Sequence, residues 1–470
     1  MKKEQTTQTL TEGPLLRQIL FFTFPLIATA VLQLLFNTAD TVVVGRWGGD
    51  TPQECANSLA AVGSCAALIT LIVNLFFGLS VGSGICVAQG IGAGQREDVE
   101  KYVHTSVLAS AIAGGIVTVI GLVFSRTFLS WMGTDDSILD EATLYMTAYF
   151  CGMPANMLYN YCASMLRSAG DTVHPLIYLS VAGVVNVILN LITVLVFHWG
   201  ALGVGIATAV SQWISCALTV WFMLRTDGPC HLDLHRLRID GKKLKRVVLL
   251  GIPAGIQSTL FSISNVLNQA AVNSFGPTVV AGNTAASNLD NYIYTTQNAL
   301  YHTTLTFVGQ NAGAMKYHRM KKSFLYCVAV VAAVGLAVGG VVLAFGEPLL
   351  RIFSPENEEV VQAGLVRLSI VCIPYFLCGW MEVGCGALRG LGKSLTPMIV
   401  SLIGACLLRV VWIYTVFAAV RTPESLYIAW PVSWGATAAV QFLFVFLTLR
   451  KMKKSQGVDP DDPVSLSANG

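Results

Sequence analysis

Long apolar segments alternate with short polar segments along almost the whole chain. About 20 consecutive apolar residues are enough to cross a bilayer as a helix, and runs of this length or longer recur from residue 15 to residue 449. The pattern predicts twelve membrane-spanning helices, at residues 15–45, 58–90, 102–124, 138–165, 174–197, 200–224, 246–274, 279–311, 321–345, 360–386, 396–418 and 427–449. We therefore expect an all-α polytopic membrane protein.

Composition supports this class. The 470 residues are 54% apolar and only 12% charged, with a mean hydropathy of +0.64, whereas a soluble protein carries about twice that charged fraction. The 43 glycines suit the close helix packing found in lipid. The twelve cysteines show no paired spacing. Cys230, His231 and His235 lie together in the central loop, where we expect a solvated loop rather than a zinc site.

The distribution of charge predicts the orientation of the helices. If both termini are cytosolic, most of the 29 basic residues fall in cytosolic segments, above all in the loop from Arg225 to Arg246. The loops on the other side are acidic. One of them contains Asp135, Asp136 and Asp140, for which we expect a helix-capping role.

The two halves of the chain repeat one another. The matched motifs are Pro25 with Pro253, residues 89–93 with 310–314, Pro154 with Pro374, and residues 166–170 with 388–392. Six spans in each half give both halves the same orientation, so we expect two lobes around a cavity, related by a pseudo-two-fold axis along the membrane normal. The predicted limits are an N-lobe at 1–224, a cytosolic linker at 225–246, a C-lobe at 247–454 and a disordered tail at 455–470.

This architecture favours an alternating-access transporter over a channel. Two diverged halves cannot supply a ring of identical selectivity residues. The chain contains no Walker lysine motif, and its loops are too short for a nucleotide-binding domain. The energy for transport must then come from an ion gradient or from the gradient of the substrate itself.

The first span carries a stripe of polar residues. Gln33, Asn37 and Asp40 are spaced four and three apart, so they share one face of the helix. A carboxyl group at membrane depth is costly unless it faces a protein interior or a water-filled cavity, which makes Asp40 a candidate functional residue. The alternative is a structural hydrogen bond between helices.

Other spans of the N-lobe place polar groups at a similar depth. Counted from the outer ends of their helices, Asn186, Asn190, Thr208 and Tyr145 lie about as deep as Asp40. Carboxylate, amide and hydroxyl oxygens suit a small cation or a proton relay. We predict a cation or proton site at these five residues, with sodium as a possible ligand of Asp40, Asn186, Asn190 and Thr208. Hydrogen bonding between helices is the alternative for each Asn and Thr.

Several motifs carry a resemblance to a known family. The segment FNTADTVVVGRWG, the pair QGIGAG and QNAGA, and the pair MLRSAGDT and ALRGLGKS resemble the multidrug and toxic compound extrusion (MATE) family over essentially the whole chain. The resemblance implies a two-lobed exporter driven by sodium ions or protons. It also implies that Asp40 is the coupling residue, with Asn186, Asn190, Thr208 and Tyr145 around it.

The chain departs from the family pattern at some positions. Some branches have a carboxylate where this chain has Asn190, which favours protons over sodium. Other branches carry acids on the seventh and tenth helices. Here the seventh helix offers amides, and by the repeat Asn268 stands where Asp40 stands, while Glu382 lies in the tenth. Glu382 could instead pair with Arg409 on the next helix. The predicted substrate cavity is lined by Gln33, Asn37, Gln212, Asn265, Asn268 and Glu382.

The expected function is secondary active export of amphipathic organic cations in exchange for protons or sodium ions. A cation entering from outside neutralises Asp40 and favours bending of the first helix at Pro25, which serves as a hinge. We expect no enzymatic activity, no cofactor besides the transported coupling ion, and no nucleic-acid partner. Its partners are drug-like small molecules and the lipid bilayer. The protein is expected to be a monomer of the bacterial plasma membrane with both termini cytosolic.

Two alternatives remain open. A flippase for lipid-linked saccharides has the same broad architecture but needs basic residues in its cavity, and Arg409 is the main one within the spans. A membrane-embedded transferase needs clustered acids for magnesium, and the nearest candidate is the outer-loop group of Asp135, Asp136 and Asp140.

Overall fold

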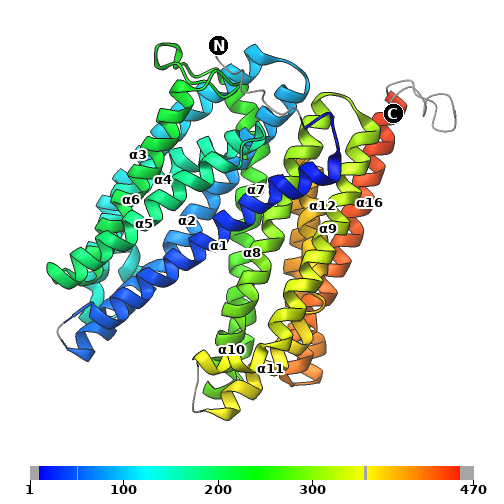
Figure 1. Ribbon diagram of the computed structural model, residues 1–470. Coiled ribbons are helices and arrows are strands. Elements are labelled where there is room, and N and C mark those ends of the chain that lie inside the picture. The colour runs from blue at the N-terminus through cyan, green and yellow to red at the C-terminus, as the bar shows by residue number, and fades with distance from the viewer. Residues whose placement is uncertain (1–9, 50, 354–356, 456–470) are drawn as a thin grey trace. The chain divides into compact units, whose positions relative to one another are not determined.

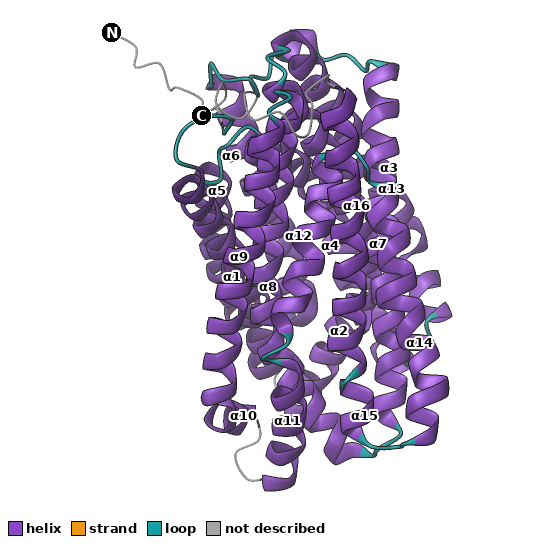
Figure 2. Ribbon diagram, turned by 90° about the vertical axis from the view of Figure 1, so that its right-hand side faces the viewer, coloured by secondary structure: helices purple, strands orange, loops and turns teal. Residues whose placement is uncertain are grey.

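The computed structural model describes residues 10–49, 51–353 and 357–455, and these form helices and loops without any strand (Figures 1 and 2). The predicted tail at 455–470 lies, beyond its first residue, outside the described residues. Each of the twelve predicted spans coincides with a helix or with a series of consecutive helices. The all-α polytopic fold is therefore confirmed.

The first half of the chain contains six long helices. They are α1 (Leu15–Trp47), α2 (Pro52–Gly92), α3 (Arg96–Trp131), α4 (Asp136–Ser168), α5 (Val173–Leu191) and α6 (Gly200–Arg225). A π-helical segment, η1 (Ile192–Val196), extends α5 toward its outer end. A single 3-10 turn, η2 (Leu234–Arg236), lies in the linker that follows.

The second half has more breaks. Its elements are α7 (Gly241–Asn273), α8 (Pro277–Gly313), α9 (Tyr317–Ala344), α10 (Gly346–Phe353), α11 (Glu358–Val371), α12 (Tyr375–Gly390), α13 (Leu395–Ser401), η3 (Leu402–Leu407), α14 (Leu408–Trp412), η4 (Ile413–Phe417), α15 (Pro423–Tyr427) and α16 (Ala429–Ser455). The predicted tenth span is two helices, α11 and α12, bent by 51°. Pro374 precedes α12 and has no backbone N–H to continue the helical ladder, which explains the break.

The hydropathy of the helices separates two of them from the rest. Among the described residues, nine helices are long and apolar enough to span a membrane, or ten if the bent pair α11 and α12 is one span. Helices α4 and α8 fall short because their polar side chains are numerous. In α8 the side chains of Asp290, Gln297 and Gln310 are buried. Polar groups at membrane depth face protein rather than lipid. We therefore infer that α4 and α8 pack against other helices of their own units.

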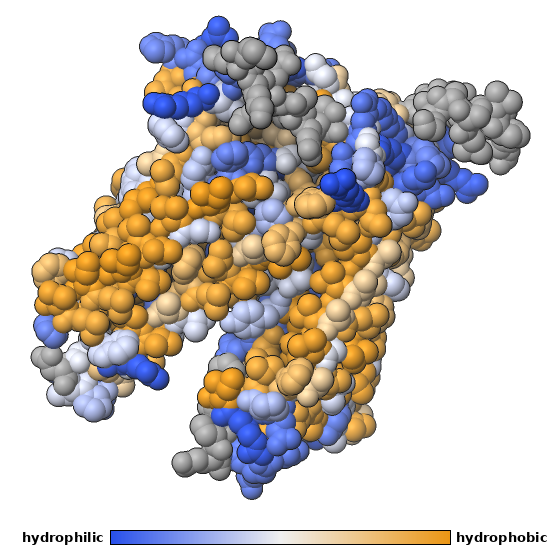
Figure 3. Space-filling model, in the orientation of Figure 1, coloured by the Kyte–Doolittle hydropathy of each residue, from blue (hydrophilic) through white to orange (hydrophobic). Residues whose placement is uncertain are grey.

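Hydrophobic side chains cover the middle lengths of the helices, and polar side chains gather at their ends (Figure 3). On α3, for example, Ile116, Val119 and Val123 are more than half exposed. Such a band of exposed apolar residues is expected of a surface that faces lipid.

The described chain falls into two compact units. Of the described residues, the first contains those in 24–91 and 95–255, and the second contains those in 10–23, 92–94 and 256–455. Helices α1 and α7 therefore each change unit within two residues of the matched prolines, Pro25 and Pro253. The predicted limits of the N-lobe, linker and C-lobe stay a prediction.

The start of α1 packs inside the second unit. The ring of Phe22 meets the edge of Phe307 at 5.5 Å, and the hydroxyl groups of Thr23 and Thr303 are 2.9 Å apart. This segment is thus joined to α8 by both apolar and polar contacts.

The start of α7 packs inside the first unit, against α2. The two backbones touch: a Cβ atom on Gly78 would lie 2.0 Å from the nitrogen of Gly255, and one on Gly82 would lie 2.7 Å from the nitrogen of Gly251. Glycine is required at these positions because any side chain would force the two helices apart.

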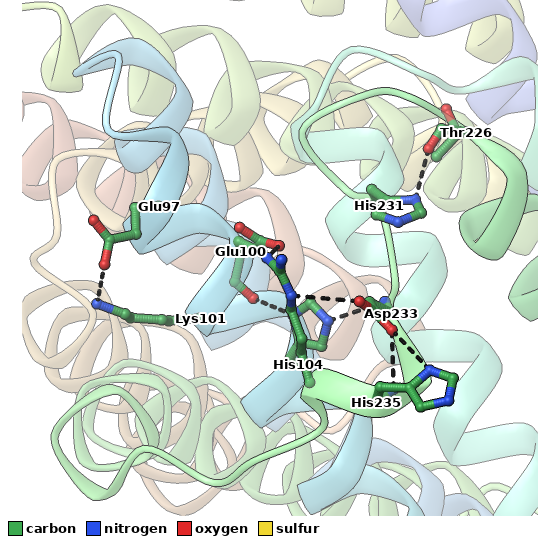
Figure 4. A network of polar contacts seen from close by, with 9 residues as sticks. Glu97, Glu100, Lys101, His104, Thr226, His231, Asp233 and His235 are labelled. Atoms are coloured by element: carbon green, nitrogen blue, oxygen red, sulfur yellow. Dashed lines mark hydrogen bonds and ion pairs between the residues drawn. The ribbon is translucent and has the colours of Figure 1, made fainter.

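The linker between the halves docks on the start of α3 (Figure 4). His104 accepts a hydrogen bond from the backbone N–H of Asp233 at its Nε2 atom, 3.0 Å away, and its Nδ1 atom lies 2.7 Å from the carbonyl oxygen of Glu100. Arg236 approaches the carboxylate of Glu100 at 3.3 Å. Cys230 is buried, whereas His231 is partly exposed and His235 is exposed, so the prediction of a solvated loop holds for the histidines and not for Cys230. Among the described residues no three His, Cys, Asp or Glu side chains form a possible metal site.

Candidate ion-coupling site in the first unit

Helices α1 and α5 pack closely on successive turns. Gly183 of α5 sits directly on the ring of Phe36, where a Cβ atom would lie 1.8 Å from the ring carbon Cε2. One turn further along α1 is Asp40, and further along α5 is Asn190. The missing side chain at Gly183 lets the two helices approach until these polar groups meet.

Asp40 is held by amides of α5. The Nδ2 group of Asn190 donates to Oδ1 of Asp40 at 2.5 Å and also approaches Oδ1 of Asn186 at 3.3 Å. Asn190 is fully buried and Asn186 is 5% exposed, whereas Asp40 is only half-buried. The structure thus brings Asp40, Asn186 and Asn190 together, and it leaves one side of the carboxyl group accessible.

Helices α5 and α6 carry buried oxygen atoms that lack a hydrogen-bond donor. The Oδ1 atom of Asn190 and the Oγ1 atom of Thr208 have no hydrogen-bond partner among the described residues. Buried polar atoms are nearly always paired in native proteins, so these oxygen atoms can accept a hydrogen bond or coordinate an ion. Carboxylate, amide and hydroxyl oxygens are acceptors that fit a proton or a small hard cation.

Aromatic hydroxyl groups of α4 face the same carboxyl group. Tyr145 and Tyr149 both interact electrostatically with Asp40, and their ring centroids are 6.3 Å apart. Gln212 of α6 lies beside Tyr149. Sequence reasoning selected Tyr145 and Gln212 but missed Tyr149. Its position four residues after Tyr145, on the same helix face, was the available signal.

The remaining predicted residues of α1 lie along the same face. Gln33 and Asn37 are exposed, and the hydroxyl group of Thr29 donates to the carbonyl oxygen of Pro25 at 2.7 Å. A carbonyl that accepts from a side chain in this way is one of the features that accompany helix bending. The assigned roles of these residues as cavity wall and hinge stay predictions.

The counterpart region of the second unit has no carboxylate on α7. Asn265 is exposed, while Asn268 is buried and donates to the carbonyl oxygen of Ser264 at 2.9 Å. Glu382 is buried in α12, and the charge it interacts with is Arg389. Among the described residues it makes no ion pair with Arg409, so that hypothesis is not supported.

Sequence reasoning missed a buried ion pair in the second unit. The guanidinium group of Arg367 binds the Oδ2 atom of Asp290 through Nη2 at 2.7 Å and through Nε at 3.1 Å. Its Nη1 group donates to Asn283 at 2.7 Å. Asp290 was hidden in the least apolar of the predicted spans, whose hydropathy gave no reason to single it out.

Two of the three acids near the start of α4 have defined partners. The side chain of Asp135 caps α4 by accepting from the backbone N–H of Ser137 at 2.8 Å, and hydrogen bonding by Ser137 holds the pKa of this carboxyl below its ordinary value. Asp140 pairs with Arg126. Asp135 thus caps a helix as predicted, whereas Asp140 is used in an ion pair.

Comparison with known proteins decides the family. The model of the MatE family matches residues 25–192 and again residues 253–415. The chain belongs to the MatE family. The double match also confirms the internal repeat, since the two matched segments begin at Pro25 and Pro253.

Relatives of this MatE-family chain cover most of its length. It is 26% identical over 407 residues to the "probable multidrug resistance protein YoeA" of Bacillus subtilis, covering 84% of this chain and 86% of the relative. It is 22% identical over 402 residues to the "FAD transporter" of Shewanella oneidensis, with coverage of 84% and 86%. A solved structure titled as the outward-facing conformation of a multidrug resistance MATE family transporter superposes with a TM-score of 0.88 at 21% identity, covering 97% of this chain and 100% of the other. That likeness shows the fold.

Proposed function

We propose that this protein exports drug-like organic compounds across a bacterial plasma membrane in exchange for protons or sodium ions, and that Asp40 is the group that binds the coupling ion. The proposal draws on MatE-family membership and on relatives named as multidrug resistance proteins. The observation that carries it is the half-buried carboxyl group of Asp40, held by Asn190 at membrane depth with unpartnered oxygen atoms nearby.

The chemistry of this site suits an exchange mechanism. An ionised Asp40 can attract a cationic substrate or a small cation, and a bound proton or sodium ion removes that attraction. Neutralisation also removes the cost of a charge at membrane depth. Burial of the neutral group is then favoured, and α1 can move at Pro25, where the helical hydrogen-bond ladder is interrupted.

The ion gradient provides enough energy for this exchange. One proton that crosses a potential of 100 mV contributes about 2.3 kcal/mol. One pH unit adds about 1.4 kcal/mol. Together these terms support an accumulation ratio of a few hundred-fold for the exported compound.

The test is efflux from energised vesicles under imposed pH or sodium gradients. Asp40→Asn keeps the shape of the side chain and removes the titratable charge, so we expect normal insertion into the membrane and loss of uphill efflux. Thermal stability should not fall, because an amide is cheaper to bury than a carboxylate. Undiminished gradient-driven efflux in Asp40→Asn would refute the assignment of Asp40.

Two further variants calibrate this result. Asn190→Ala removes one ligand and no charge, so it should weaken coupling less than Asp40→Asn. Glu382→Gln in the second unit should impair export of some substrates without abolishing coupling. Complete loss of ion-driven transport for every substrate in Glu382→Gln, with normal folding, would move the coupling site to α12.

The same vesicles identify the coupling ion and the substrate class. Efflux that survives the absence of sodium but fails when the pH gradient is collapsed assigns protons, and the reverse assigns sodium. The substrate panel should pair organic cations with FAD, because one relative is named as an FAD transporter. Transport of FAD alone would exclude a multidrug role.

A further inference from the structure

The buried charges of the second unit do not balance. Its described interior contains the acids Asp290 and Glu382 and the cations Arg367, Arg389 and Arg409, all less than a tenth exposed. Asp290 and Arg367 form an ion pair, and Glu382 interacts with Arg389. Arg409 is left without an acidic partner among the described residues.

The surroundings of Arg409 are polar and aromatic rather than acidic. The side chain is 5% exposed, and its Nε group donates to the hydroxyl oxygen of Ser433 at 2.9 Å. The guanidinium carbon lies over the rings of Trp430 and Trp434, at 5.3 and 5.8 Å from their centroids. No other hydrogen bond joins it to the described part of the chain, so the donors at both terminal nitrogens are available.

The repeat relates this arrangement to the site around Asp40. Helix α7 contacts η3, where Sγ of Cys406 lies against the carbonyl oxygen of Leu260 and the side chain of Ser264. This contact corresponds to that of Phe36 with Gly183 in the first unit.

The spacing of the two matched segments supports this register. The C-terminal ends of the two matched segments are residues 192 and 415. The number of positions between these ends equals the number between Asn186 and Arg409. Counting on from the matched contacts, Asn268 takes the place of Asp40, and Arg409 takes the place of Asn186. The second unit thus repeats the cation site of the first unit with the acid replaced by an amide and an amide replaced by a cation.

The backbone around Arg409 is also unusual. The five-residue helix α14 that carries it lies between two π-helical segments, η3 and η4. Each π turn accommodates an extra residue in the helix, and such turns occur frequently at functional sites. Here they alter which side chains of the helix face the interior of the unit.

We propose that Arg409, with the hydroxyl group of Ser433, binds a small monovalent anion inside the second unit. A buried guanidinium group without a counter-charge is strongly disfavoured, and an anion would supply that charge. The planar guanidinium fork matches a carboxylate, and its terminal donors can also hold a halide ion. The anion comes either from the solution, as chloride, or from a transported compound, as its carboxylate.

The site can be tested by stability measurements on the purified, intact protein. Sodium chloride, sodium bromide or sodium acetate is titrated at constant ionic strength against sodium isethionate, which is neither a halide nor a carboxylate, and the unfolding temperature is recorded. We expect a saturable rise with at least one of the three anions, since a ligand that binds only the folded state stabilises it. Saturation by chloride or bromide assigns a solution halide, and saturation by acetate alone assigns a carboxylate. No saturable rise with any of them would overturn the proposal.

Variants locate the effect. Arg409→Gln should abolish the saturable rise, whereas Arg409→Lys should retain a weaker one. Asn268→Asp places an acid at the position that Asp40 occupies in the first unit. It should provide an internal counter-charge, remove the anion dependence and raise stability in isethionate. Arg351→Gln, on the exposed helix α10, is the matched control and should behave as the unmodified protein.

The proposal remains testable if Arg409→Gln does not fold. Ser433→Ala removes one donor and should weaken the apparent anion affinity several-fold, a loss typical of one hydrogen bond to a charged group. The same anion affinity in Ser433→Ala and in Arg409→Lys as in the unmodified protein would show that the anion binds elsewhere.

Discussion

Breaking the Asp290–Arg367 pair should destabilise the second unit strongly. Both side chains are less than a tenth exposed, and two hydrogen bonds of 2.7 and 3.1 Å join them. With charge centres about 4 Å apart and an effective dielectric constant of about 20, the attraction is about 4 kcal/mol. Removal of one partner leaves the other charge buried and unpaired, which costs about 3–5 kcal/mol.

The substitution Asp290→Asn keeps the size of the side chain and one oxygen acceptor. We therefore expect a loss of about 3 kcal/mol in the free energy of unfolding, at the lower end of that range. Arg367→Met removes the cation and its bond to Asn283 as well, and it should cost more. The double variant Asp290→Leu with Arg367→Met should recover much of the loss, because no charge is then left unpaired.

The measurement is thermal or denaturant unfolding of the purified protein. The unmodified protein, the single variants Asp290→Leu and Arg367→Met, and the double variant that combines them form a double-mutant cycle. Arg351→Gln breaks an exposed pair with Glu347 and serves as the control, for which we expect no significant change. The reasoning is refuted if Asp290→Asn unfolds within about 1 kcal/mol of the unmodified protein, or if the double variant is as unstable as the sum of the two single variants.

Three other predictions concern packing, orientation and pH. Gly183→Ala would drive a methyl group into the ring of Phe36, so it should cost about 1–3 kcal/mol of stability. It should also impair efflux by displacing α5 from α1, and an unchanged Tm would contradict this packing. Cysteine labelling in intact cells should find the linker from 225 to 246 cytosolic and residues 135–141 outside, and labelling of both from one side would exclude the twelve-helix topology. Hydrogen bonding by the backbone N–H of His235 lowers the pKa of Asp233 from its ordinary value of 3.8. The contact therefore stabilises the linker fully at pH values above 3.8, and this stabilisation is lost as the pH falls through the lowered pKa. Amide exchange at His235 should accelerate in that acidic range, and Asp233→Asn should remove this dependence.

The apolar pattern predicted the fold well because each helix must cross the same thickness of hydrocarbon. It could not predict the break at Pro374, because a proline within a span is compatible with either a kinked helix or two separate helices. It also gave no sign of η1, η3 and η4. A π turn depends on how one extra residue is accommodated against neighbouring helices, and that is a property of packing.

For the candidate site, depth arguments placed Asp40, Asn186 and Asn190 at one level, and the structure joins them by hydrogen bonds. Depth alone does not fix the rotation of a helix about its axis. For this reason Thr208 was placed with the others although no hydrogen bond links it to Asp40, and Tyr149 was overlooked. The partner of Arg367 was missed because Asp290 is distant in sequence and lies in a helix of mixed polarity.

The exchange of helix segments between the two units has a consequence for how such a protein could have arisen. Residues 10–23 pack with the second unit, and residues 241–255 pack with the first. When two identical chains exchange the same structural element, the result is a domain-swapped dimer. An ancestral chain with a single repeat would then have folded completely only as a dimer. Gene duplication and fusion would have placed both copies in one chain, so that the exchanged segments are now exchanged within that chain. A fragment ending at residue 240 would still lack part of its own core, so the two halves of this gene are not two independent proteins.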